Sequence, residues 1–190
     1  MDIVRQSNNN VGGDIIARDK HVATTFNFPG GGASVDELSL LYAKLKEKGG
    51  GEASGGSFCE ELEHYLAARN GSDVRGLEEK LRDSGRLDQL DTATELKEKA
   101  MKAVMRFQSS RTAQRIYTII LTDLHTKFDL MVTPAIQEGA KRREVDMCIQ
   151  QVLETTKSML GENVLELTVR DLLSLLYFLG GNCHIRWDKC

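Results

Sequence analysis

The sequence has little proline and no long apolar run. Only 2 of its 190 residues are proline, so few positions interrupt its helical patterns, because proline breaks a helix interior. The longest apolar stretch, Leu172 to Leu179, contains Ser174 and is far shorter than the roughly 20 residues of a membrane-spanning helix. Residues Met1 to Gln6 lack the apolar core of a signal peptide. The lack of a membrane-spanning run and of a signal peptide predicts a cytoplasmic protein that does not interact with membranes.

An excess of charge of one sign is also missing. The chain has 25 Lys+Arg and 28 Asp+Glu, for a net charge of -3, which argues against a generally basic nucleic-acid-binding protein. Basic residues cluster over 97–115 and 141–143, but glutamates alternate with part of the first cluster and flank the second. We interpret both clusters as solvated helix faces, with phosphate contact as the alternative.

The sequence shows no clear arrangement of catalytic or metal-binding residues. Its four histidines lie in unrelated contexts, and no nucleophile elbow is present. The cysteines are widely spread, at Cys59, Cys148, Cys183 and Cys190, and are expected to be reduced thiols. A zinc site that joins Cys59 and His64 to the C-terminal cysteines is disfavoured, because structural zinc sites usually begin with a tight Cys-x2-4-Cys pair. We therefore predict a protein that is not an enzyme and binds no cofactor or metal.

Glycine is unevenly distributed and divides the chain into two predicted units. Ten of the 17 glycines precede residue 57. Within residues 1–33, two segments carry β-branched and aromatic residues between turn signals, Asp14–Ala17 and Val22–Phe28. They predict a short β-hairpin-like element, which must pair with the helical body, another copy or a partner, because a lone hairpin is marginally stable. A disordered tail is the alternative. Residues 34–190 form the second unit, a helical bundle with a short C-terminal tail.

The pattern from Ser34 onward predicts a mainly α fold, a bundle of about six or seven helices. Capping boxes predict helix starts at Ser34, Ser57 and Thr168. Thr133-Pro134 predicts a further start, for a helix that runs to about Leu160. Apolar stripes at helical spacing predict helices over 72–84, 92–109 and 111–132. The helix after Thr168 is apolar nearly all round, which places it in the core or beneath a partner.

The tail, residues 182–190, combines unusual side chains in a few positions. Two sets of side chains alternate along it: Cys183, Ile185 and Trp187 with His184, Arg186 and Asp188. This alternation is typical of a short strand, which is a candidate to pair with the N-terminal strands. Trp187 is the only tryptophan, and we expect it to anchor the tail to the bundle or to a partner.

Two segments and the helical body between them resemble one known group of proteins. Gly12–Lys20 is similar to the Gly-Asp-Ile-x-x-Arg-Asp-Lys element that precedes helical modules in bacterial conflict proteins. The helical body and its ending, Tyr177–Trp187, resemble C-terminal domains of ABC-three-component systems, of which Lamassu-type anti-phage defence is an example.

The resemblance implies a non-catalytic adaptor or scaffold subunit of a bacterial anti-phage or anti-plasmid complex. Such a domain couples an SMC/Rad50-like ATPase that senses DNA to an effector nuclease, so contact with DNA is expected to be indirect, through the complex. Only residues 1–11 precede the N-terminal element, so we expect the effector on another polypeptide, or this chain to be the small accessory subunit.

The predicted interaction residues come from the two segments that carry the resemblance. They are Asp14, Ile15, Ile16, Arg18, Asp19, Lys20, His184, Arg186 and Trp187. A different class of function stays open: a self-assembling regulatory or nucleic-acid-binding helical protein, forming a homo-oligomer through residues 1–33.

Overall fold

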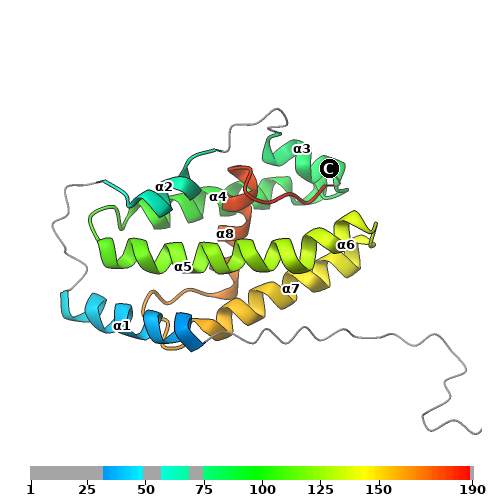
Figure 1. Cartoon of the computed structure of the whole chain (residues 1–190). Helices are drawn as coiled ribbons and strands as arrows, with labels where there is room; N and C mark the ends of the chain where they lie inside the picture. Colours follow the sequence, from blue (N-terminus) through cyan, green and yellow to red (C-terminus); the bar gives the residue numbers. More distant parts are fainter. Residues whose placement is uncertain (1–31, 49–56, 69–74, 189–190) are drawn as a thin grey trace, which may run out of the picture.

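The computed structural model describes residues 32–48, 57–68 and 75–188, and the regular structure in these ranges is helical (Figure 1). The predicted mainly α class is therefore confirmed. The predicted strands Asp14–Ala17 and Val22–Phe28 lie outside the described residues. Across the part that is described, none of the helices has the length and apolar character needed to cross a membrane.

The centre of the bundle is α5 (Arg111–Lys127), which is buried on most of its surface. In Figure 1 it runs along the front, with α1 (Gly32–Lys48) below it and α2 (Glu60–Leu66) above it. The helix α7 (Arg142–Met159) also packs against α5, and an ion pair between Lys46 and Glu162 links α1 to the loop that follows α7. Apolar side chains of α1 and α2 are enclosed by these contacts: Leu38, Tyr42, Leu45, Leu62 and Tyr65.

The C-terminal helix α8 (Val169–Gly181) crosses behind α5 in Figure 1 and packs along α4 (Leu90–Met105). Its buried positions occupy every side of the helix, from Leu172 to Gly180. The predicted position of this apolar helix in the core is therefore confirmed. The short helix α3 (Leu77–Asp83) and the 3-10 turn η1 (Leu87–Gln89) complete this side of the bundle.

One of the three predicted capping boxes is present as expected. The Thr168 hydroxyl accepts a hydrogen bond from the Asp171 N–H (3.2 Å), and the Asp171 carboxylate accepts one from the Thr168 N–H (2.9 Å). Although burial opposes it, hydrogen bonds from Lys99 and Thr168 hold the pKa of the Asp171 carboxyl below its usual value. The start of α8 is thus specified by local sequence, as a capping box requires.

The other two capping boxes are wrong. The helix α1 begins at Gly32, so Ser34 lies inside its first turn. The cap of α2 is Cys59, without a side-chain hydrogen bond. Ser57 instead turns toward α5, where its hydroxyl accepts a hydrogen bond from Arg111 Nη2 (3.3 Å). A tertiary contact has therefore replaced the local cap that the sequence pattern predicts.

The helix predicted from Thr133 to about Leu160 is two helices. The π-helical segment η2 (Phe128–Val132) follows α5 directly and leads into the five-residue α6 (Thr133–Gln137), with Pro134 in its first turn. Gly139 then adopts φ +81°, in the left-handed region that favours glycine. The chain turns there and restarts as α7. Since α6 is a short continuation of α5, the number of separate rods stays close to the prediction.

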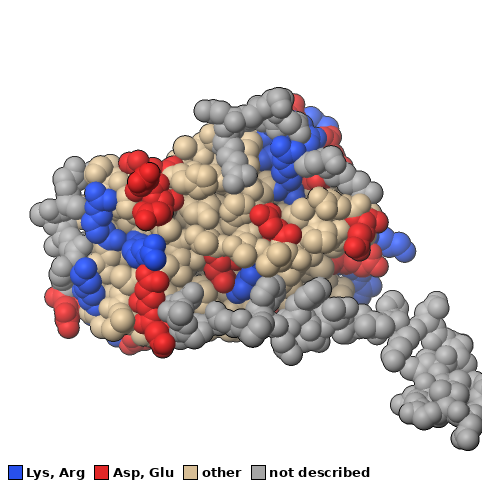
Figure 2. Space-filling view, in the orientation of Figure 1, with Lys and Arg blue, Asp and Glu red and all other residues tan. Residues whose placement is uncertain are grey.

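The surface of the bundle carries charges of both signs. On the face shown in Figure 2, Lys and Arg side chains alternate with Asp and Glu, and the described part of this face has no large area of one sign. Exposed ion pairs join charges of opposite sign on the bundle, for example Arg115 with Glu37 (2.8 Å). Members of the two basic clusters are paired with carboxylates, Lys99 with Asp171 (2.7 Å) and Arg142 with Asp88 (2.8 Å), which fits their interpretation as solvated helix faces.

Tyr117 makes the stability of the bundle sensitive to alkali. Burial, with a further contribution from Asp171, raises the pKa of Tyr117 to about 12, against about 10 for an unfolded tyrosine. Between these values the folded state binds more protons, so stability falls as pH rises. The loss is about 2–3 kcal/mol, at 1.36 kcal/mol per pKa unit. Urea unfolding at pH 9 to 12 measures it, and Tyr117→Phe is expected to flatten the curve. An equally steep decline in Tyr117→Phe would contradict the assignment.

Candidate functional site

The C-terminal segment, residues 182–188, folds back onto the bundle instead of forming a strand. It consists of turns, and Cys183 adopts φ +63°. The backbone N–H of His184 donates to the Leu179 carbonyl (2.9 Å), which curls the segment over the end of α8. Both sets of alternating side chains contribute buried members, among them His184, Ile185, Trp187 and Asp188. The strand predicted from the alternation of residues 183–188 is therefore wrong, because side chains from other helices enclose the segment on both sides.

Trp187 anchors this segment to the bundle. Its indole stacks on Tyr177 of α8 (ring centroids 5.4 Å apart, planes at 28°) and meets the Phe128 ring edge-on (5.5 Å). Only 3% of Trp187 is exposed. Gly180 lies directly beneath it, and a Cβ at that position would overlap the indole ring. The predicted anchoring role is confirmed, with the bundle as the surface to which the tail is anchored.

Lys80 of α3 holds the backbone of the same segment from inside. Its Nζ donates to the Gly180 carbonyl (2.6 Å) and more weakly to the Ile185 carbonyl (3.4 Å), and the residue is 1% exposed. Burial lowers the pKa of the Lys80 ammonium, and the nearby Cys183 and Asp188 act in the opposite direction. The Gly180 carbonyl lies in the last turn of α8, where helix carbonyls lack intrahelical partners. The Ile185 carbonyl lies beyond the helix.

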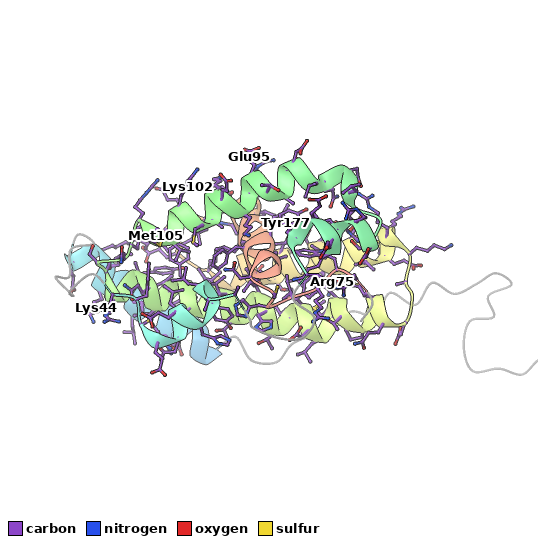
Figure 3. All side chains as sticks on the ribbon, turned by 90° about the horizontal axis from the view of Figure 1, so that it is seen from above. Lys44, Arg75, Glu95, Lys102, Met105 and Tyr177 are labelled. Atoms are coloured by element: carbon purple, nitrogen blue, oxygen red, sulfur yellow. The ribbon has the colours of Figure 1, made fainter. Side chains whose placement is uncertain are left out.

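Arg75 closes the segment from the solvent side (Figure 3). Its Nη2 forms an ion pair with the Asp188 carboxylate, whose side chain is 1% exposed. Its Nη1 also contacts Asp83 Oδ2 of α3 (2.8 Å), whose side chain is far more exposed. The backbone carbonyl of Arg75 accepts a hydrogen bond from Cys183 Sγ (3.5 Å). The segment is therefore held by charge and hydrogen bonds as well as by the indole.

Three of the four histidines meet where this segment contacts α2 and α5, and one of them, His184, belongs to the segment. The His184 ring lies 5.1 Å from the His64 ring of α2 and 6.0 Å from the His125 ring of α5, and Tyr65 packs among them. His125 Nε2 also approaches Asp129 Oδ2 at 3.4 Å. The rings meet in tilted and edge-on contacts. Within the described ranges, no three His, Cys, Asp or Glu side chains are arranged to hold a metal ion.

A pocket of about 280 Å3 lies between the start of α7, the end of α3 and the C-terminal segment. Its charged lining is balanced: Arg86 donates to Asp146 Oδ1 (2.7 Å), and Arg142 forms a bidentate pair with Asp88 (2.8 Å for each bond). Hydrogen bonding from Arg142 also lowers the pKa of the Asp88 carboxyl. These arginines are already committed to carboxylates, so the pocket offers an incoming anion little free positive charge.

The start of α2 is fastened to α5 through a buried glutamine. Gln114 is fully buried, and its Oε1 accepts a hydrogen bond from the Cys59 N–H (2.8 Å). Its Nε2 donates to the carbonyls of Gln108 (2.6 Å) and Ser57 (3.3 Å). A buried amide with all these bonds satisfied fixes where residues 57–59 dock.

The structure brings together only part of the predicted interaction set. Asp14, Ile15, Ile16, Arg18, Asp19 and Lys20 lie outside the described residues. His184 and Trp187 are buried, and Arg186 is half-buried. Three residues that sequence patterns did not point to hold these segments in place: Lys80 and Arg75 hold the C-terminal segment, and Gln114 holds residues 57–59. The burial of Lys80 could have been predicted, because it lies between Leu77 and Leu81 on the apolar stripe of its helix.

Comparison with known proteins identifies a family. Residues 76–187, more than half of the chain, match the model of C-terminal domain 9 of the ABC-three-component systems. The match begins at the start of α3 and ends at Trp187, so it includes α4 to α8 and most of the C-terminal segment, and leaves out α1 and α2. Searches of curated proteins and of solved structures found no significant match.

Proposed function

Because the chain belongs to the family of C-terminal domain 9 of the ABC-three-component systems, we propose that it is a non-catalytic adaptor subunit of a bacterial conflict complex. In this role it holds an SMC/Rad50-like ATPase and an effector nuclease together. The observation that carries the proposal is the match over residues 76–187. The family is described by its place in a multi-component system and not by a reaction.

The architecture of the described residues supports an adaptor. The matched region is a closed helical body, and Trp187 of its C-terminal segment packs against Tyr177 and Phe128. The helices α1 and α2 lie outside the matched range and dock on α5 through Gln114 and through the ion pair of Arg115 with Glu37. These N-terminal helices connect residues 1–31, and any partner that those residues bind, to the body of the domain.

Within this proposal, the complex is a Lamassu-type anti-phage or anti-plasmid system in the cytoplasm. The ATPase recognises foreign DNA, and this chain contacts DNA only through the complex. The mixed charge of the face shown in Figure 2 supports this view, as does the engagement of Arg142 and Arg86 with carboxylates. The residues Asp14 to Lys20 form the docking element, and the C-terminal segment with His184, Arg186 and Trp187 supports the partner surface.

Co-purification tests the proposal. The tagged full chain, expressed with the ATPase and effector encoded beside its gene, is expected to elute with both in size exclusion. The double variant Arg18→Glu/Lys20→Glu is expected to lose the partners. The matched variant Lys141→Glu/Arg143→Glu, at exposed positions near the start of α7, is expected to keep them. If the wild-type chain elutes alone beside a soluble ATPase, the adaptor role is wrong.

A further inference from the structure

The outward face of α4 divides into an acidic half and a basic half. Ala93, Leu96, Ala100 and Val104 face the core. The opposite stripe carries Asp91, Glu95 and Glu98, followed by Lys102, Met105 and Arg106, and all six are exposed. In Figure 3, α4 forms one edge of the molecule, and Glu95 and Lys102 lie on the side away from the other helices. The described part of the chain therefore leaves this stripe uncovered.

The order of these charges makes the stripe complementary to itself. In an antiparallel helix pair with a two-fold axis between residues 98 and 99, position 95 lies opposite 102, and 91 lies opposite 106. Glu95 of each copy then faces Lys102 of the other, and Asp91 faces Arg106. A parallel pair in the same register would instead oppose like charges. Lys99 takes no part in this count, because it is paired with Asp171 (2.7 Å), whereas Lys102 makes only a longer, exposed contact with Glu98 of its own helix (3.6 Å).

A groove beside the acidic half fits the apolar residues of the basic half. The groove, of about 520 Å3, lies between α3 and α4, and Leu77, Leu90 and Thr94 line it together with carboxylates. Met101 and Met105 project from the same side of α4 as Leu90 and Thr94, since all four lie within about 60° of one another around a helix of 3.6 residues per turn. A two-fold axis perpendicular to the two helices leaves this side of both copies facing the same way. The same axis places position 105 of one copy opposite position 92 of the other, so Met105 falls between Leu90 and Thr94.

We propose that two copies of this chain associate antiparallel through α4, with reciprocal Glu95–Lys102 and Asp91–Arg106 pairs and with Met105 of each copy in the α3–α4 groove of the other. The contact is isologous, so it closes at a dimer. It differs from self-association through residues 1–33, and it is independent of the adaptor role. Its stripe, from residue 91 to 106, is about 22 Å long at 1.5 Å per residue. A contact this small belongs to the weak, salt-sensitive class.

Charge exchange tests this arrangement in the full chain. Multi-angle light scattering over a concentration series at low salt is expected to show a monomer–dimer equilibrium. The single variants Glu95→Lys and Lys102→Glu are each expected to weaken it about tenfold, because both symmetric pairs become repulsive. The double variant Glu95→Lys/Lys102→Glu restores opposite charges in exchanged positions and is expected to recover the dimer.

Mixing the two single variants gives the sharpest result. One variant carries lysine at both positions and the other carries glutamate at both, so each repels itself, but in a mixed pair every lysine faces a glutamate and a heterodimer is expected. Glu61→Lys on α2 and Arg143→Glu on α7 are matched controls at exposed positions and are expected to leave the equilibrium unchanged. Far-UV circular dichroism melts confirm that every variant is folded. A wild-type chain that is monomeric at all concentrations overturns the proposal, and so does a dimer that the single variants leave intact.

Discussion

Replacing Trp187 with alanine is expected to lower the free energy of unfolding by about 3–5 kcal/mol. The indole is 3% exposed and contacts Tyr177 and Phe128, so the substitution leaves a cavity between α8 and η2. Urea unfolding followed by far-UV circular dichroism measures the loss, because the variant has no tryptophan to report by fluorescence. Met147→Ala, at an exposed position of α7, is expected to change stability by less than about 0.5 kcal/mol.

A substitution at Gly180 tests whether this stability depends on the close approach of the indole. Since a Cβ at position 180 would overlap the Trp187 ring, Gly180→Ala alone is expected to displace the C-terminal segment and cost about 1–3 kcal/mol through overpacking. In the Trp187→Ala background the same substitution meets empty space and is expected to cost little. Such non-additivity is the signature of two residues in contact. If the two losses of stability are additive, the cost of Gly180→Ala does not come from contact with the indole.

Removal of the Arg75 guanidinium is expected to cost nearly as much. Arg75→Met leaves the buried Asp188 carboxylate without its ion-pair partner, and breaking a buried pair from one side costs about 3–5 kcal/mol. Chemical unfolding at neutral pH measures this loss. The matched control is Asp83→Asn, which removes the exposed partner of the same arginine and is expected to cost at most about 1 kcal/mol.

A second substitution separates the buried charge from the lost packing. In Arg75→Met, the further change Asp188→Asn removes the uncompensated carboxylate, so part of the lost stability is expected to return. The two substitutions together should then cost less than the sum of their separate effects. If Asp188→Asn only adds to the damage, the energy of Arg75 comes from its other contacts and not from this ion pair.

Local patterns predicted the parts of the fold that local interactions determine. The Thr168 capping box and the apolar α8 are both as the sequence indicates, because the cap bonds join residues three apart and the apolar side chains surround one helix. The cap at Ser57 was wrong for the opposite reason. Its hydroxyl accepts a bond from Arg111, 54 positions away, and no pattern within a few residues reports such a partner.

The candidate site was less predictable than the fold. The alternation of residues 183–188 has a strand period, but the Ile185 carbonyl, which a strand would pair, accepts from Lys80, 105 positions earlier in the chain. The histidines beside it come from α2, α5 and the C-terminal segment. Only the packing of the whole bundle brings these residues together. The anchoring role of Trp187 could be predicted, because a single large aromatic residue in a polar tail has few other uses.

The position of Trp187 and Asp188 also constrains when this protein can fold. Phe128, Tyr177, Lys80 and Arg75 are all synthesised before the residues that cover or neutralise them. Until residue 188 has left the ribosome, the nascent chain therefore displays an open aromatic face and lacks the partner of Arg75. A chain cut short before Trp187 exposes the kind of apolar surface that chaperones and proteases recognise. Closure of the bundle therefore depends on two residues that follow every described helix in the chain.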